Sequence, residues 1–145
     1  MKVKECMSHD VEVANPDESI RDAAAAMERI DAGILPVGKD DRLVGMITDR
    51  DIAVRAVARG LGPDTKVREV MTEDVKYCFE DDDVDEVCDN MSEIQVRRLP
   101  VVNNDKRLVG IISLGDIACR EEPEHAGHAL QGIAQPGGKH TQTHH

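Results

Sequence analysis

The chain has 145 residues and a formal net charge of −11, with 18 Lys and Arg against 29 Asp and Glu. DNA and RNA binding depends mainly on phosphate neutralisation by basic side chains, so this charge argues against a nucleic-acid partner. It argues equally against docking on an anionic membrane surface. No apolar run approaches the ~20 residues of a membrane-spanning helix. A chain of this length can fold without disulfides or metals, as one domain or as two small halves.

The N-terminal segment MKVKECMSHD and the cysteines predict a cytoplasmic protein. The segment has two lysines but no apolar stretch after them, so no secretory signal is expected. The cysteines form neither a C-x-x-C pair nor a zinc-ligand spacing, and we expect them to be reduced thiols. With one Tyr, one Phe and no Trp, the core must be aliphatic.

The chain contains two copies of one unit. LVGMITDRDI from Leu43 is repeated as LVGIISLGDI from Leu108, and VKECMSHDV from Val3 aligns with VREVMTEDV from Val67. Such internal repeats set the organisation of a chain before any single motif does. We therefore expect three parts, namely a first repeat, a second repeat and a tail: 1–62, 63–120 and 121–145.

The first half of each repeat predicts a strand and then a helix. In the first repeat VEVA at 11–14 is a short strand, and Ser19-x-x-Asp22 is a capping box that opens the helix. Apolar residues at helical spacing give that helix one buried face. In the first repeat these residues are Ile20, Ala23, Ala24, Met27 and Ile30, and in the second they are Val84, Val87, Cys88, Met91 and Ile94.

The second half of each repeat predicts a hairpin and a second helix. ILPV and LVGMI form the hairpin of the first repeat, and RLPVV and LVGII form that of the second. Thr48-x-x-Asp51 is a capping box whose helix runs to about Arg59, and the matching helix starts at Ser113. A half of about 60 residues buries little core alone, so the halves should pack on each other and leave a cleft where they meet.

These repeated elements resemble a tandem pair of CBS (cystathionine β-synthase) domains, known as a Bateman module. Both copies carry h-P-V before the hairpin and G-h-h-[S/T]-x-x-D after it, in the same order, over about residues 1–120. The segments TDRDI and VRRLPV are similar to those of small bacterial stand-alone two-CBS proteins, some of which respond to stress or hypoxia. The resemblance implies an α/β (α+β) fold of two βαββα repeats packed pseudo-symmetrically through their sheets.

The resemblance also implies regulation rather than catalysis. CBS pairs commonly bind AMP, ADP, ATP, NAD or S-adenosylmethionine in the clefts between the repeats, and two modules usually form a flat homodimer. No cofactor is required, and an unidentified regulated protein would read the ligand state. The alternative is a ligand-free structural or protein-interaction dimer with empty clefts. An enzyme is not expected, because no G-x-S-x-G, P-loop or H-E-x-x-H motif occurs.

The acids of the two capping boxes have two interpretations. Thr48 with Asp51, and Ser113 with Asp116, can act purely as helix caps that satisfy free N–H groups and favour the helix dipole. The resemblance adds that the acid would accept hydrogen bonds from ribose hydroxyls while the hydroxyl residue meets sugar or phosphate. Both interpretations can hold together, because helix N-termini attract anions.

The strand before each hairpin supplies the other candidates. In the family this strand forms walls around adenine, and basic residues just before it reach phosphates in some relatives; solvated arginines are the alternative. Leu35 and Leu99 are expected in the core. The expected ligand-binding residues are Ile34, Pro36, Thr48, Arg50, Asp51, Arg97, Arg98, Pro100, Ser113 and Asp116.

Three further features are expected to be structural. Gly45 and Gly110 mark close backbone approach or tight packing inside a strand. FEDDDVDE at 79–86 predicts a solvated loop and an acidic helix start rather than a metal site. The tail holds His125-x-x-His128, but no carboxylate or cysteine completes a ligand set. We expect no metal there and a tail that is mobile or lies on a partner chain.

Overall fold

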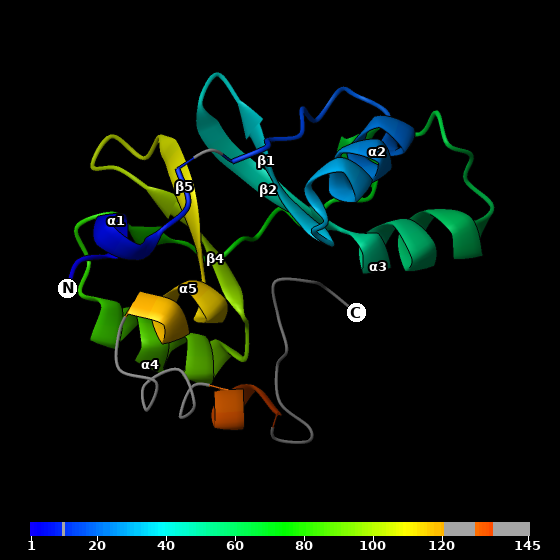
Figure 1. Ribbon diagram of the computed structural model, residues 1–145. Coiled ribbons are helices and arrows are strands. Elements are labelled where there is room, and N and C mark those ends of the chain that lie inside the picture. Colours follow the sequence, from blue (N-terminus) through cyan, green and yellow to red (C-terminus); the bar gives the residue numbers. More distant parts are fainter. Residues whose placement is uncertain (10, 121–129, 135–145) are drawn as a thin grey trace. The chain divides into compact units, whose positions relative to one another are not determined.

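The computed structural model describes residues 1–9, 11–120 and 130–134, which belong to two compact units (Figure 1). The repeat-one unit is Glu12–Val75. The repeat-two unit combines Met1–Val11 with the described residues from Lys76 onward. The compact units therefore follow boundaries different from those of the sequence repeats. The opening segment of each repeat packs with the other repeat, and the mixed helices and strands confirm the α/β (α+β) fold class.

The repeat-one unit is built around one antiparallel hairpin. Ile34 pairs with Thr48 at one end of this hairpin and Lys39 with Arg42 at the other. The turn between the strands places Asp40 and Asp41 at positive φ. The elements, in chain order, are α2 (Ile20–Ile30), β1 (Ile34–Lys39), β2 (Arg42–Thr48), α3 (Asp49–Asp51), η1 (Ile52–Ala56), η2 (Val57–Arg59) and η3 (Val67–Glu69).

Helix α2 begins at the predicted residue, with one of the two hydrogen bonds of a capping box. The Ser19 side chain accepts a hydrogen bond from the Asp22 N–H at 3.1 Å, and Ile20, Ala23 and Met27 are buried. The expectation was wrong for two residues, because Ala24 and Ile30 are exposed and Ala26 is buried instead. Ala26 lies three residues after Ala23 on the same helix face, whereas Ala24 lies on the solvent side.

The helix after β2 changes its winding along its length. It starts as α3, continues as the wider π turn η1 and closes as the 3-10 turn η2. Gly60 follows at φ 78°, a left-handed conformation that glycine adopts without steric cost. The expected end near Arg59 is confirmed, and the π segment was not predicted.

The repeat-two unit is built around a three-stranded sheet. Its strand order is β3-β4-β5, with β3 parallel and β5 antiparallel to β4. The expected face of α4 is confirmed, with four residues buried and Ile94 half-buried. The elements are α1 (Val3–Cys6), β3 (Cys78–Phe79), α4 (Val84–Ile94), β4 (Arg98–Val102), β5 (Leu108–Ser113) and α5 (Leu114–Arg120).

The first strand is much shorter than predicted. In the first repeat VEVA contributes only an isolated bridge, in which Ala14 pairs in parallel with Val37. The matching residue of the second repeat, Cys78, pairs with Val101 and is followed by one more strand residue. The strand predicted over 11–14 is therefore wrong in extent. Val11 belongs to one compact unit and the rest of VEVA to the other.

The segments that the repeats exchange pair with the middle of β2 and β5. Ser8 and Ile111 exchange backbone hydrogen bonds of 2.9 and 3.1 Å in the repeat-two unit. Thr72 and Met46 exchange bonds of 2.8 and 2.9 Å in the repeat-one unit. A glycine is required at each crossing, as the sequence suggested. A Cβ on Gly110 would lie 2.6 Å from the Ser8 carbonyl oxygen.

The N-terminal helix α1 is hydrogen-bonded to the acidic run 79–86. The Val3 and Lys4 N–H groups donate to the Asp82 and Glu80 carbonyls, each at 2.9 Å. Lys4 also lies 3.0 Å from the Asp81 carboxylate. This hydrogen bond and the opposite charge lower the pKa of Asp81 and raise that of Lys4. The acidic run thus has a structural role, as expected.

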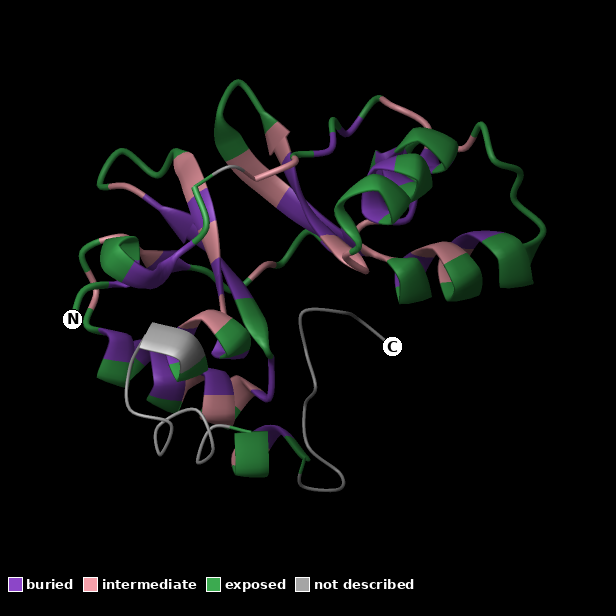
Figure 2. Ribbon diagram, in the orientation of Figure 1, coloured by how far each residue is buried: buried purple, intermediate pink, exposed green. Residues whose placement is uncertain are grey.

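Each unit has its own aliphatic core (Figure 2). Leu99 and Leu35 lie in these cores as expected, with 0% and 1% exposure. Part of the tail also joins the core of the repeat-two unit. Ile133 is buried, and the Gln95 side chain donates to the Gly132 carbonyl at 2.9 Å. The expected mobile or partner-bound tail is therefore wrong for residues 130–134, while the tail histidines lie outside the described residues.

Within the described ranges, no helix is long and apolar enough to cross a membrane.

Candidate functional site

The hairpin of the first repeat ends at a closed helix cap. The Thr48 hydroxyl accepts from the Asp51 N–H at 2.9 Å, and the Asp51 carboxylate accepts from the Thr48 N–H at 3.0 Å. Because β1 pairs with β2, Ile34 lies directly opposite Thr48. The Asp49 N–H also donates to the Gly33 carbonyl at 2.9 Å, which joins the start of β1 to the helix. The strand start and the acid therefore form one cluster.

The second repeat builds the same cap with a more open acid. The Ser113 hydroxyl accepts from the Asp116 N–H at 3.1 Å, and Asp116 accepts from the Ser113 N–H at 3.0 Å. Arg98 lies opposite Ser113 across the hairpin, and the Leu114 N–H donates to the Arg97 carbonyl at 3.0 Å. Asp116 is half-buried, whereas Asp51 is only 3% exposed. The second repeat thus presents its acid more openly.

Asp51 is surrounded by contacts from its own unit. The Arg55 Nε lies 3.8 Å from an Asp51 oxygen, and the Arg55 guanidinium donates to the Val70 and Met71 carbonyls at 3.3 and 3.1 Å. The Arg55 side chain is 17% exposed. In this arrangement Asp51 acts as a helix cap and ion-pair partner, which supports the structural interpretation for the first repeat. Sequence reasoning missed Arg55, although its spacing of four residues from Asp51 was a usable signal.

The two repeats differ at the start of the first hairpin strand. A Cβ on Gly33 would lie 2.6 Å from an Asp49 carboxylate oxygen, so this carboxylate fills the space beside the strand. In the second repeat Arg97 and Leu114 occupy the aligned positions. A negative side chain is thus replaced by an apolar one, and a glycine by a cation. The second repeat is therefore the more favourable of the two for an anion.

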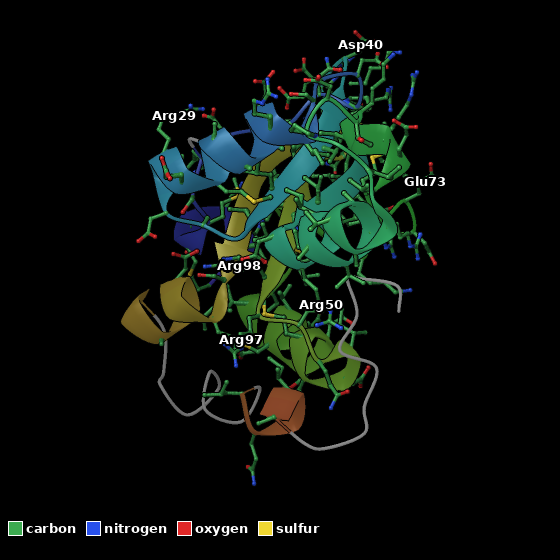
Figure 3. The ribbon with its side chains drawn as sticks, turned by 90° about the vertical axis from the view of Figure 1, so that its right-hand side faces the viewer. Arg29, Asp40, Arg50, Glu73, Arg97 and Arg98 are labelled. Carbon is green, nitrogen blue, oxygen red and sulfur yellow. The ribbon has the colours of Figure 1, made fainter. Side chains whose placement is uncertain are left out.

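The candidate arginines are exposed in their own units (Figure 3). Arg98 is the first residue of β4 and Arg97 precedes it, while Arg50 lies in α3. Across the part of the chain that the structure describes, none of the three forms an ion pair. Their exposure is consistent with both expectations, solvated arginines and arginines that contact an anionic ligand.

The hydrophobic candidates on the strands are less accessible. Pro36 and Pro100 are buried, and Ile34 is half-buried. Pro36 pairs with Met46 and Pro100 with Ile111, so both lie within their hairpins. Ile34 is the one of these three that presents apolar surface next to a cap.

Thr72 carries a polar atom that sequence reasoning did not single out. Its side chain is 2% exposed, and its hydroxyl has no hydrogen-bond partner among the described residues. Burying an unpaired hydroxyl costs about 1–3 kcal/mol. The hydroxyl lies in the segment that the Arg55 guanidinium contacts through Val70 and Met71.

We expect Thr72→Val to raise the free energy of unfolding by about 1 kcal/mol, because it removes the unpaired hydroxyl and keeps the branched shape. The urea midpoint of purified protein measures this change. Thr65→Val is the matched control and should be neutral or destabilising, because the Thr65 hydroxyl donates to the Gly62 carbonyl at 2.7 Å. A less stable Thr72→Val protein would show that the hydroxyl has a partner.

The described thiols have the character of core residues. Cys6, Cys78 and Cys88 are buried, and burial raises the pKa of Cys78 to about 12. A thiol with such a pKa is protonated at neutral pH and is a poor nucleophile. Among the described residues, no group of three His, Cys, Asp or Glu side chains could hold a metal ion.

Comparison with known sequences shows the family. The CBS domain profile matches residues 3–57 and 67–120, and the chain belongs to the CBS domain family as a tandem pair. It is 38% identical over 133 residues to the CBS domain-containing protein YhcV of Bacillus subtilis, covering 91% of this chain and 94% of that protein. It is 41% identical over 125 residues to Hypoxic response protein 1 of Mycobacterium tuberculosis, covering 85% and 86% of the two chains.

Solved structures agree with this assignment. Hypoxic Response Protein I, solved with two coordinated zinc ions, has a TM-score of 0.76 at 38% identity, covering 83% of this chain and 98% of that chain. The CBS domain pair of MJ0100, solved with 5′-methylthioadenosine and S-adenosyl-L-methionine, has a TM-score of 0.72 at 33% identity, covering 82% and 94%. CBSX2, solved in complex with AMP, has a TM-score of 0.72 at 25% identity, covering 81% and 93%.

Proposed function

We propose that this protein is a regulatory module that binds an adenosine-containing ligand and changes its affinity for a partner protein. The observation that carries the proposal is the second-repeat cluster. In it, Arg98 lies opposite Ser113 across the hairpin, and the Asp116 carboxylate that caps the next helix is half-buried. A carboxylate can accept hydrogen bonds from ribose hydroxyls, and guanidinium groups hold phosphate by paired donors. Related CBS pairs that bind AMP or S-adenosylmethionine support the same ligand class.

Among adenosine ligands, the second repeat favours those with a phosphate. Arg97 and Arg98 supply two positive charges without ion-pair partners among the described residues. In the first repeat the Asp49 carboxylate fills the space beside Gly33, which aligns with Arg97. Charges in contact with a ligand lie well within the screening length of about 8 Å at physiological salt, so salt does not cancel their attraction. The overall net charge of −11 therefore does not prevent phosphate binding at this location. AMP, ADP, ATP and NAD fit the second repeat better than S-adenosylmethionine.

The module acts by binding rather than by catalysis. Cys78 is held in the protonated form by burial, and each capping acid is held by backbone hydrogen bonds. We propose a cytoplasmic homodimer that takes part in signal transduction, and its likeness to a hypoxic response protein favours a role in stress. A bound ligand shifts a conformational equilibrium only through a difference in affinity for two states, and the regulated partner would read that shift.

We expect gently purified full-length protein to retain an adenosine ligand, and AMP or ATP to stabilise the ligand-free protein. Ligand at about 100 times its Kd should add about 2.7 kcal/mol to the free energy of unfolding. Native mass spectrometry reports retained ligand and dimer mass together, and thermal shift with AMP, ADP, ATP, NAD and S-adenosylmethionine reports binding. Guanosine monophosphate is the control for the base.

The second candidate is a ligand-free interaction module. The burial of Asp51 and its pairing with Arg55 favour this role for the first repeat, because a ligand would have to compete with existing contacts. A dimer that retains no small molecule and gives no thermal shift or heat of binding with the whole panel would support this candidate and contradict the nucleotide proposal.

A further inference from the structure

We propose that residues 130–134 form a C-terminal strap that holds the turn between α4 and β4. Gln95 is the positioning residue in this turn, and its hold sets the affinity of Arg97 and Arg98 for phosphate. The inference rests in part on the proposed function, because its affinity half requires that a phosphate-bearing adenosine ligand binds. Its other half, the hold of the strap on the turn, concerns contacts within the repeat-two unit alone. The two halves are measured separately.

The strap is anchored at three points on the C-terminal end of α4, beside which it is drawn as a short orange helix in Figure 1. Ile133 is 6% exposed and belongs to the same core cluster as Val96. The Gln95 side-chain amide donates to the Gly132 carbonyl at 2.9 Å. A Cβ on Gly132 would lie 2.0 Å from the Ser92 Oγ and 3.2 Å from the Ser92 carbonyl oxygen. An apolar anchor, a hydrogen bond and a close backbone approach therefore hold the strap on this helix end.

The equivalent turn of the first repeat is exposed. Gln95 aligns with Asp31, and both residues end their helices in the left-handed conformation, at φ 58° and 54°. Asp31 is exposed, whereas Gln95 is only 9% exposed. One residue earlier, Ile30 is 41% exposed, and its counterpart Ile94 is half-buried against the repeat-two core. We attribute this added burial to the strap, because its Ile133 is part of that core.

The turn leads directly into the candidate phosphate site. The Val96 N–H donates to the Met91 carbonyl at 3.1 Å, and the Arg97 carbonyl accepts from the Leu114 N–H at 3.0 Å. The direction in which the two arginine side chains leave the backbone depends on this turn, which Gln95 fixes through the strap. Ordering a side chain before the ligand arrives is worth about 2- to 10-fold in affinity. The strap thereby favours phosphate binding without touching the ligand.

Hydrogen–deuterium exchange of the full chain tests the hold of the strap. Ile133→Asp replaces the apolar anchor with a charge, so the amides of residues 130–134 and of Val96 should exchange about tenfold faster than in the wild type. Leu130→Asp is the matched control, because Leu130 is 45% exposed in the same strap and the substitution adds the same charge. Its amides should exchange at the wild-type rate. Gln95→Met keeps the side-chain length but removes the donor, and it should lie between the two.

Isothermal titration calorimetry with AMP and, separately, adenosine tests the affinity half on the same variants. Ile133→Asp and Gln95→Met should weaken AMP binding about 3- to 10-fold and leave adenosine binding within a factor of about two. A general loss of stability would weaken both ligands alike, so the difference between them reports the positioning of the arginines. AMP should in turn slow the exchange of residues 130–134 in the wild type by a similar factor, because coupling between two equilibria is reciprocal.

Each half of the inference fails on its own result. Wild-type protein that binds neither AMP nor adenosine contradicts the proposed function and the affinity half together. AMP affinity that is unchanged in Ile133→Asp, or that falls equally with adenosine affinity, contradicts the positioning role alone. Equal exchange in Ile133→Asp and Leu130→Asp contradicts the strap, whatever the ligand does. If Ile133→Asp does not fold, the comparison of Ile133→Ala with Leu130→Ala decides the same question.

Discussion

Arg97→Gly is expected to weaken AMP binding by about 10- to 100-fold and to leave adenosine binding within a factor of about two. A hydrogen bond from a charged donor contributes about 1.5–3 kcal/mol, and 1.4 kcal/mol corresponds to a tenfold change in Kd. Adenosine lacks the phosphate, so loss of the guanidinium should not affect it. Isothermal titration calorimetry with both ligands at one salt concentration measures the difference.

Arg59→Ala is the control, because Arg59 is also exposed and its replacement lowers the net charge equally. It should leave both affinities unchanged. The reciprocal variant carries Gly33→Arg together with Asp49→Leu, which gives the first repeat the residues of the second. Both changes are needed, because a Cβ on Gly33 would lie 2.6 Å from the Asp49 carboxylate. Equal losses for AMP and adenosine in Arg97→Gly would contradict a phosphate role for Arg97.

Gly110→Ala is expected to lower the free energy of unfolding by about 3 kcal/mol. The added Cβ would lie 2.6 Å from the Ser8 carbonyl oxygen and 2.9 Å from the Met7 sulfur. The sulfur can move, but the carbonyl belongs to a backbone that is paired with Ile111 on the same strand. Overpacking of this kind typically costs 1–3 kcal/mol, and the backbone clash places this site at about the upper end. Urea unfolding of the repeat-two unit, monitored by hydrogen exchange of its core amides, measures this change in the free energy of unfolding.

Gly62→Ala is the matched control, because nothing lies within 4 Å of its added Cβ. Its stability should stay equal or rise slightly, since alanine restricts the unfolded chain. Gly45→Ala should destabilise the repeat-one unit in the same way, because its Cβ would lie 2.8 Å from the Thr72 carbonyl oxygen. If Gly110→Ala were as stable as Gly62→Ala, the opening segment would not lie against β5.

The sequence predicts the parts of this fold that depend on near neighbours. The N-cap bond of Ser19 and the capping box of Thr48 connect residues three apart, and the hairpins need only two apolar runs and a polar turn. Each of these signals lies within a few residues of sequence, and the structure confirms the helix starts and the hairpins that they predict. The family resemblance rests on the same local motifs in duplicate, which is why it is visible in the sequence.

The parts that could not be predicted depend on distant contacts. The donors of Arg55 reach carbonyls 15 and 16 residues away, and a backbone carbonyl leaves no trace in the sequence. The burial of Asp51 could not be distinguished from the half-burial of Asp116, because both acids occupy the same motif. The first strand was overestimated because VEVA has the apolar alternation of a strand, while only Ala14 finds a partner. The ligand-binding roles of the candidate residues stay predictions.

The exchange of opening segments between the repeats bears on how such a chain could arise. Met1–Val11 completes the core of the later repeat, and the residues around Thr72 complete the earlier one. A gene that encoded only one repeat would produce a protein unable to cover its own hydrophobic core, unless two molecules traded their N-terminal arms. Duplication and fusion of that gene would have converted an exchange of N-terminal arms between two molecules into an exchange between two repeats of one polypeptide.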